Sequence, residues 1–138
     1  MASLSTAIAL AKSRFITQWE ALHSDIPVVW TNDPIPEFDQ PGPVVHVEVN
    51  GGVEDIIAFG GPQQNLYRSL GEVIIRVLVP QGSGDELVRD LADDAASIFR
   101  GWSSGELRFY GVSTRDDGVD GGWYMLEVIA SFENDQVA

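Results

Sequence analysis

The chain has 138 residues, 44% of them hydrophobic, a length typical of one domain that buries a real core. It carries 21 acidic and 8 basic residues, a formal net charge of −13, and so lacks the clustered cations that hold a nucleic acid backbone. There is no cysteine, which excludes disulfides and thiolate metal sites. No apolar run approaches the ~20 residues of a membrane span, and residues 1–10 lack the pattern of a secretory signal. We therefore expect a single domain, residues 1–138, with no membrane association.

The first third of the chain predicts a helix, a short strand and a connector. Apolar residues recur at spacings of three and four over residues 3–22, which predicts an amphipathic helix. Residues 26–30 predict a short strand. Residues 32–43 contain four prolines, which exclude a helix or an inner strand and predict an extended connector. Phe38 in this connector either folds back on the core or contacts a neighbouring molecule.

The middle of the chain predicts strands around one long apolar run. Residues 44–50 alternate like a half-buried strand, residues 50–52 resemble a turn, and residues 53–59 resemble the returning strand. The polar, glycine-bounded stretch 60–65 is expected to be flexible before a partner binds. Residues 66–79 predict a long central strand, apolar on both sides, which either helices or another subunit would cover on its two faces.

The last part of the chain predicts one more helix and two more strands. Ser83 and Glu86 have the spacing of a capping box, and the apolar stripe that follows predicts a helix over residues 85–100. Residues 106–112 predict a strand, residues 113–122 an exposed loop, residues 123–132 the last strand, and residues 133–138 a tail prone to fraying. The fold class expected is α+β, with a single mixed, mostly antiparallel sheet of about five or six strands and two helices packed on one face.

Motifs of site chemistry are weak in this sequence. Residues 82–84 form a Gly-Ser-Gly turn before a helix, but the lysine of a phosphate loop and the third glycine of a dinucleotide fingerprint are missing. Asp116, Asp117 and Asp120 fit a hairpin loop better than a calcium loop. His23 and His46 are too few and too far apart for a recognisable metal site. We predict no catalytic, cofactor-binding or metal-binding residue.

Large apolar side chains near strand edges and loops are the more informative feature. Trp30, Trp102 and Trp123 accompany phenylalanines in this position, and aromatic side chains often anchor interfaces. Together with the two-sided apolar strand, they favour a homo-oligomer. The residues that we expect at oligomer or partner contacts are Phe38, Phe59, Gln63, Gln64, Arg115, Asp116, Asp117 and Trp123.

The order of these elements and several short motifs resemble the small tail-terminator proteins encoded by siphophages and prophages. The motifs are VVWTNDP (28–34), VHV (45–47), GEVIIRV (71–77), VPQGSG (79–84), IFRG (98–101) and GGWY (121–124). The resemblance implies a structural protein of the virion tail, assembled in the bacterial host cytoplasm. It implies a ring, typically a hexamer, that ends polymerisation of the tail tube protein and meets a head-completion protein.

In such a ring, the negative charge of the chain is expected to have a function. DNA would pass through it without specific binding, and negative charge along the channel repels the phosphate backbone. The alternative is a small-ligand-binding module, or an enzyme with an unrecognised acidic site. That alternative predicts a monomer or dimer with a pocket of ~300 Å³ or more.

Overall fold

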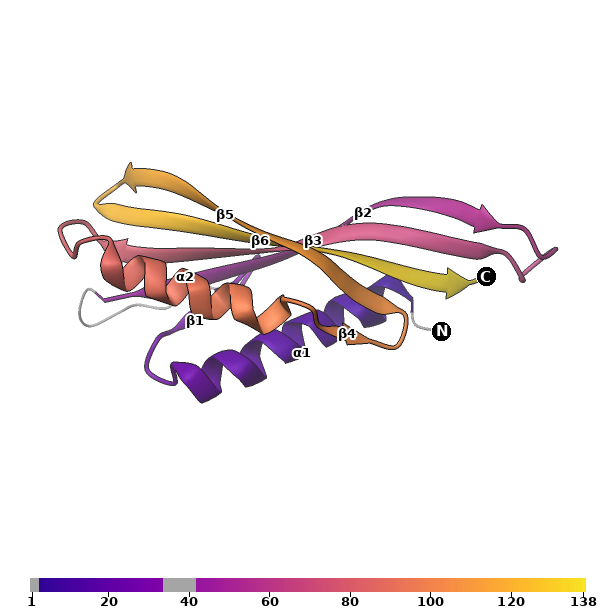
Figure 1. Cartoon of the computed structure of the whole chain (residues 1–138), viewed down its shortest axis with the longest axis horizontal. Coiled ribbons are helices and arrows are strands. Elements are labelled where there is room, and N and C mark those ends of the chain that lie inside the picture. Colours follow the sequence, from indigo (N-terminus) through magenta and orange to yellow (C-terminus); the bar gives the residue numbers. More distant parts are fainter. Residues whose placement is uncertain (1–2, 34–41) are drawn as a thin grey trace.

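The computed structural model describes residues 3–33 and 42–138 (Figure 1). Phe38, one of the expected contact residues, lies outside the described residues. The described elements are the helices α1 (Leu4–Leu22) and α2 (Glu86–Phe99) and the strands β1 (Val28–Trp30), β2 (Val44–Ala58), β3 (Leu66–Pro80), β4 (Ser103–Ser104), β5 (Leu107–Asp120) and β6 (Trp123–Val137). None of the described helices is long and apolar enough to cross a membrane.

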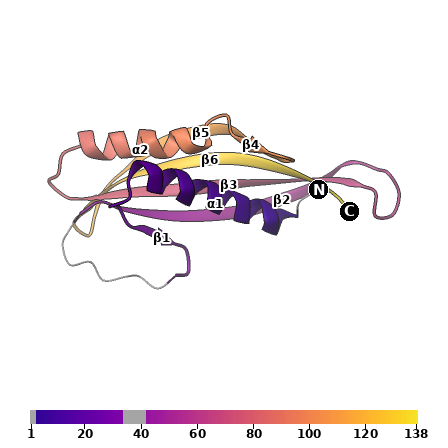
Figure 2. The same ribbon diagram turned by 90° about the horizontal axis from the view of Figure 1, so that it is seen from below.

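The described strands form one six-stranded sheet in the order β1-β2-β3-β6-β5-β4. Strand β1 runs parallel to β2, and the other neighbouring pairs are antiparallel. Both helices lie on the same side of this sheet, as two views of the chain show (Figures 1 and 2). The predicted α+β fold, with a mixed and mostly antiparallel sheet and two helices on one face, is confirmed.

The core lies between the helices and the sheet face below them. Alternate strand residues point into it because successive side chains of a strand face opposite ways. An aromatic cluster joins the layers: Phe15 of α1 stacks on Trp19 at 5.6 Å and on Phe99 of α2 at 6.3 Å between ring centroids. At the end of α1, His23 Nε2 lies 2.6 Å from Asp94 Oδ2, so a polar contact also ties the two helices together.

Strand β3 is the centre of the sheet, as the sequence predicted. It pairs with β2 on one side and with β6 on the other, the second pairing running from Leu66↔Val137 to Pro80↔Trp123. The helices cover only one of its faces, so the alternative in which helices cover both is wrong for the described part of the chain. Cover by another subunit remains a prediction.

Gly71 allows three strands to pack closely near the middle of β3. A Cβ atom there would lie 2.4 Å from Phe132 Cζ and 2.5 Å from the carbonyl oxygen of Asn50, nearer than packed atoms come. Neither the buried ring nor the strand backbone has room to move, because interiors are close-packed.

Gly71→Ala is therefore expected to lower the free energy of unfolding by about 1–3 kcal/mol, the usual cost of overpacking. Urea denaturation followed by circular dichroism measures this change. Gly111→Ala is the matched control, because Gly111 also lies in a strand but has no neighbour within 4 Å of the added atom. Equal stability of the two variants would contradict the steric argument.

Strand β2 is longer than predicted, and the turn expected at residues 50–52 is wrong. Gly51 and Glu54 both pair with β3, with a bulge between them. An Asn-Gly-Gly sequence suits a bulge as well as a turn, because glycine permits the local kink. The residues 53–59, predicted as a returning strand, mostly extend β2 instead. The hairpin turn falls between Ala58 and Leu66.

The loop predicted at residues 113–122 is also wrong. Strand β5 continues to Asp120, and only Gly121 and Gly122 separate it from β6. Both glycines have positive φ, 59° and 85°, as the tight turns of hairpins require. The expected fraying of residues 133–138 is contradicted as well, because β6 stays paired with β3 as far as Val137.

The start of α2 corrects the predicted capping box. The N-cap is Asp85, with no side-chain cap hydrogen bond, and the Ser83 hydroxyl instead donates to the Pro80 carbonyl oxygen at 2.7 Å in the preceding turn. Ser83→Ala is thus expected to change stability by less than about 0.5 kcal/mol, as exposed substitutions away from caps do. A loss near 1 kcal/mol in urea denaturation would restore the capping interpretation.

Candidate interaction surface

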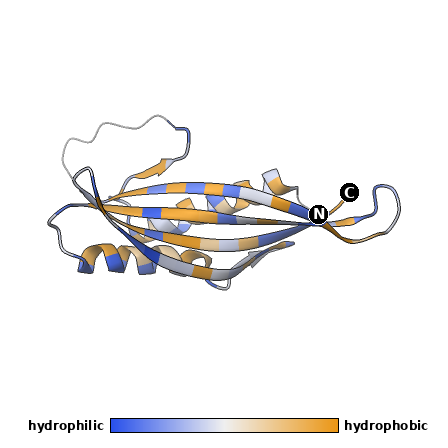
Figure 3. Ribbon diagram, turned by 90° about the horizontal axis from the view of Figure 1, so that it is seen from above, coloured by the Kyte–Doolittle hydropathy of each residue, from blue (hydrophilic) through white to orange (hydrophobic). Residues whose placement is uncertain are grey.

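The sheet face opposite the helices is not covered by any other described element (Figures 1 and 3). We call it the open face. Alternate residues of β2, β3, β6 and β5 form it, and their cross-strand neighbours lie in rows across the sheet. Two of these rows are ion-pair networks, one centred on Arg76 and the other on Asp135.

The first network lies across the row that Arg76 shares with its cross-strand neighbours. The Arg76 guanidinium donates to Glu127 Oε2 at 3.3 Å, to Glu48 Oε2 at 3.1 Å and to His46 Nδ1 at 3.2 Å. Because a guanidinium only donates, Nδ1 of His46 is the acceptor and the ring is neutral. Burial, followed by the Arg76 charge, lowers the pKa of His46. A neutral imidazole thus accepts a hydrogen bond from this arginine beside its two carboxylate partners.

Arg115 extends the same network onto the edge strand β5. Its guanidinium donates to Glu127 Oε1 at 2.9 Å and to Asp117 Oδ1 at 2.9 Å. Asp116, from the opposite side of the strand, accepts a hydrogen bond from the Tyr124 hydroxyl and one from the Gly118 N–H. These bonds, the Tyr124 one first, lower the pKa of Asp116. Asp116 and Asp117 of β5 are therefore both engaged in local contacts.

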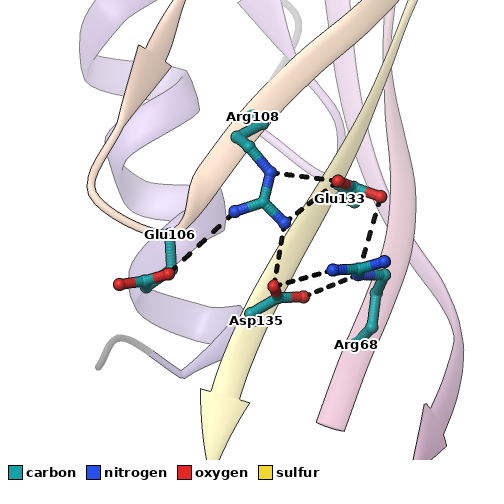
Figure 4. Close-up of polar contacts among 5 residues, drawn as sticks. All are labelled: Arg68, Glu106, Arg108, Glu133 and Asp135. Atoms are coloured by element: carbon teal, nitrogen blue, oxygen red, sulfur yellow. Dashed lines mark hydrogen bonds and ion pairs between the residues drawn. The ribbon is translucent and has the colours of Figure 1, made fainter. Parts of the chain in front are cut away.

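The second network lies near the start of β3 and the end of β6, and Figure 4 shows its contacts. Arg68 makes a bidentate pair with Asp135, at 2.8 Å from Nε to Oδ1 and 3.0 Å from Nη2 to Oδ2. Arg108 donates to Asp135 Oδ2 at 2.8 Å and to Glu133 Oε1 at 3.0 Å, and its Nη1 lies 4.0 Å from Glu106. Bidentate pairing fixes both partners in one geometry, so this network joins β3, β6 and β5.

Asp135 makes the stability of the protein depend on acid pH. The hydrogen bond from Arg68 lowers its pKa from 3.8 to about 2, outweighing its burial, and Arg108 adds to the shift. A lowered carboxyl pKa stabilises the fold fully above pH 4, and this stabilisation is lost as pH falls from about 4 to about 2. We expect a loss of about 1–2 kcal/mol, reduced by solvent screening because Arg68 and Arg108 are each 36% exposed.

Denaturation of the native chain and Asp135→Asn between pH 6 and pH 2 measures this effect. The gap between their free energies of unfolding should close as pH falls through the window. Asp90→Asn, on the exposed side of α2, is the control for the substitution itself. A gap that stays constant down to pH 2 would contradict the role of Asp135.

The two networks engage every described arginine of the open face in ion pairs. Each of its four arginines, at positions 68, 76, 108 and 115, is paired with at least one carboxylate. Within residues 3–33 and 42–138, no group of three or more His, Asp or Glu side chains is arranged to hold a metal ion. A phosphate therefore finds no unpaired guanidinium among the described residues of this face.

A groove of about 470 Å³ lies at the end of the open face where β2 and β6 begin. Its apolar lining includes Val44, Leu78, Trp123 and Met125, with Trp30 beside them. His46 and Arg76 also line it, and they are already bonded to each other. The groove is thus a mainly apolar hollow with a fixed polar border.

The opposite end of the molecule is a projecting hairpin. Strands β2 and β3 extend past the helices there (Figures 1 and 2), and we call residues 53–65 the arm. The arm exposes apolar side chains: Phe59 is 85% exposed and Val53 63%, with Ile56 and Ile57 also exposed. Its turn is ordered by the Gly60 N–H, which donates to Asn65 Oδ1 at 3.0 Å.

The structure divides the expected contact residues between these two ends. Phe59, Gln63 and Gln64 lie together on the arm. Arg115, Asp116 and Asp117 lie on β5, and Trp123 lines the groove as the first residue of β6. Of these, Arg115 and Asp117 contact each other. The expected residues therefore lie on the arm, in the groove and on both sides of β5, and they do not form one site.

Two features were not predicted from the sequence: the exposed apolar side chains along the arm and the charged row at Arg76. The signal for the arm was present, because Val53, Ile56 and Ile57 are apolar at spacings that put them on both sides of a strand. The signal for the charged row was that Arg76 and Glu127 are isolated charges in apolar strands. Pairing them required the register of β3 with β6, which their sequence positions do not reveal.

Comparisons with known proteins give the fold alone. No protein-family model matches the chain, and no curated protein matches it in sequence. Solved structures do resemble it: one of similar architecture has a TM-score of 0.65 at 18% sequence identity, over 96% of this chain and 96% of that chain. The designation of that protein states no activity, so the likeness supports the α+β architecture and nothing further.

Proposed function

We propose that the chain is a structural protein of the tail-terminator type. It assembles into a ring, typically of six copies, in the cytoplasm of a bacterial host and becomes part of a phage tail. The ring stops growth of the tail tube and presents its other side to the head-completion protein. The observation that carries this proposal is the arm, whose apolar side chains are exposed at the end of an elongated subunit.

The physical argument starts from the cost of such a surface. A projecting hairpin with apolar side chains on both sides is an aggregation hazard unless a partner covers it. The arm contains no lysine to protect it, and its only charges are Glu54 and Asp55. A structural protein that functions as an assembly gains from this feature, because the arm is buried once the assembly forms.

The charge of the chain supports the same proposal. The arginines of the open face are held by carboxylates, and the chain carries 13 more acidic than basic residues. Part of this acidic surface lines the channel of the proposed ring. DNA moves along such a wall without being retained, because like charges repel and no unpaired cation holds a phosphate.

Light scattering across concentration and electron microscopy test the proposal. We expect a closed ring with a central hole, either from the chain alone or once the tube protein of the same genome is added. Tube polymerisation in the presence of the chain should give shorter tubes. A chain that stays monomeric with the tube protein present and leaves tube length unchanged would overturn the proposal.

The groove favours a second candidate, a small-ligand-binding module. Its volume of about 470 Å³ falls within the range of about 300–1,000 Å³ that ligand pockets occupy. A thermal-shift screen with aromatic and acidic compounds tests this candidate. A compound that raises the melting temperature in the native chain, and not in Met125→Asp, would support it.

A further inference from the structure

We propose that the arm of one copy docks into the groove of another copy, with Phe59 entering among Leu78, Trp123 and Met125. The inference rests on the proposed function, since it names the contact that would build the ring. The occupant of the groove is thus a second molecule of this chain.

The two surfaces match in chemistry. The arm offers Phe59, the most exposed large apolar side chain of the described residues, and Ile57, two residues before it, is also exposed. The groove offers a mainly apolar lining and a volume of about 470 Å³, within the range of pockets that enclose a small apolar group. An aromatic anchor in an apolar pocket is the usual centre of a protein interface.

One chain cannot make this contact with itself. Leu66 follows the arm and Leu78 lines the groove, and the segment of β3 between them is a continuous strand. At about 3.3 Å per residue, twelve residues of strand separate the two surfaces by roughly 40 Å. The sheet pairing on both sides of β3 keeps this segment straight, so the arm and groove stay at opposite ends. Only a second copy brings them together.

The arrangement limits the assemblies that are open to the chain. An arm and a groove are different surfaces, so their contact is either repeated from head to tail or made reciprocally by two antiparallel copies. Head-to-tail repetition closes into a ring when the rotation permits, and reciprocal contact gives a dimer. The proposed function requires the first arrangement, whereas the arm-in-groove contact is common to both.

Engineered cysteines report the contact clearly, because the chain has none of its own. Ala58→Cys places a thiol beside Phe59 without removing it, and Met125→Cys places one in the groove. We expect a disulfide-linked dimer on mild oxidation of a mixture of the two single variants. The double variant should give a ladder of linked species up to the size of the ring. Leu22→Cys, exposed on the helix layer, replaces Met125→Cys in the matched control and should not crosslink to Ala58→Cys.

The remaining outcomes separate the contact from the proposed function. A closed ring without the crosslink between positions 58 and 125 overturns the inference and leaves the proposed function standing. Crosslinking that stops at a dimer supports the contact and overturns the ring. A monomer with no crosslink overturns the inference. So does Ala58→Cys alone if it forms as much disulfide-linked dimer as the mixture of Ala58→Cys and Met125→Cys.

Discussion

Val77→Asp is expected to prevent the chain from folding. Val77 is 0% exposed and lies in the second half of β3, with Val45 and Leu126, both buried, as its cross-strand neighbours. An aspartate there buries a charge with no partner, which costs several kcal/mol even after protonation and relaxation. Losing the buried valine adds about 2 kcal/mol. Their sum is comparable with the whole stability of a small domain, about 5–15 kcal/mol.

Solubility, circular dichroism and thermal unfolding measure this effect. We expect an insoluble or unfolded product with no cooperative transition. Val53→Asp is the matched control: the substitution is the same, but Val53 is 63% exposed, so stability should change by less than about 0.5 kcal/mol. A soluble Val77→Asp chain that unfolds cooperatively would mean that β3 is not the centre of the fold.

The central strand could be predicted because its signal is local. The run is rich in β-branched residues, ends at Pro80 and carries Arg76 as its only interior charge. These features together predict a buried strand. The helices could be predicted in the same way. Phe15 and Trp19 of α1 are four residues apart, so they lie on one face of the helix, and that face is buried in the core. Layers and fold class then follow from how such faces are buried.

The lengths of the hairpins could not be predicted, because glycine signals both turns and bulges. At Gly51 and Gly118 the chain keeps its strand pairing through a bulge, whereas at Gly121 and Gly122 it turns back. The difference lies in the pairing partner, which is distant in sequence. Because these glycines predicted a turn and a loop, the predicted strands ended before β2 and β5 do. For the same reason the sequence did not predict the projecting arm.

The candidate surfaces, too, could be predicted from the sequence only in part. Phe59 and Trp123 could be chosen from the sequence as aromatic residues near loops, but not as members of two surfaces at opposite ends of the molecule. That separation depends on the uninterrupted β3 between them. The ion pairs of Asp135 depend on register as well, since Arg68, Arg108 and Asp135 come from three different strands.

Phe59→Ser is expected to abolish self-association and leave the fold intact. Phe59 is 85% exposed, so its ring contributes little to the core and the melting temperature should stay within a few degrees of the native value. In the assembly the ring is the anchor of each contact. Truncating such an anchor typically costs 2 kcal/mol or more, about a thirty-fold loss of affinity per contact. A closed ring repeats the loss at every interface.

Sedimentation velocity across a range of protein concentrations measures this change, with the native chain run alongside. Leu22→Ser is the matched control, because Leu22 is 52% exposed on the helix layer and belongs neither to the arm nor to the residues that line the groove. It removes an exposed apolar side chain of similar kind and should leave assembly unchanged. If both variants assemble like the native chain, the arm is not the element that holds the copies together. If both fail, exposed apolar surface in general drives association, because a specific contact would respond only to Phe59.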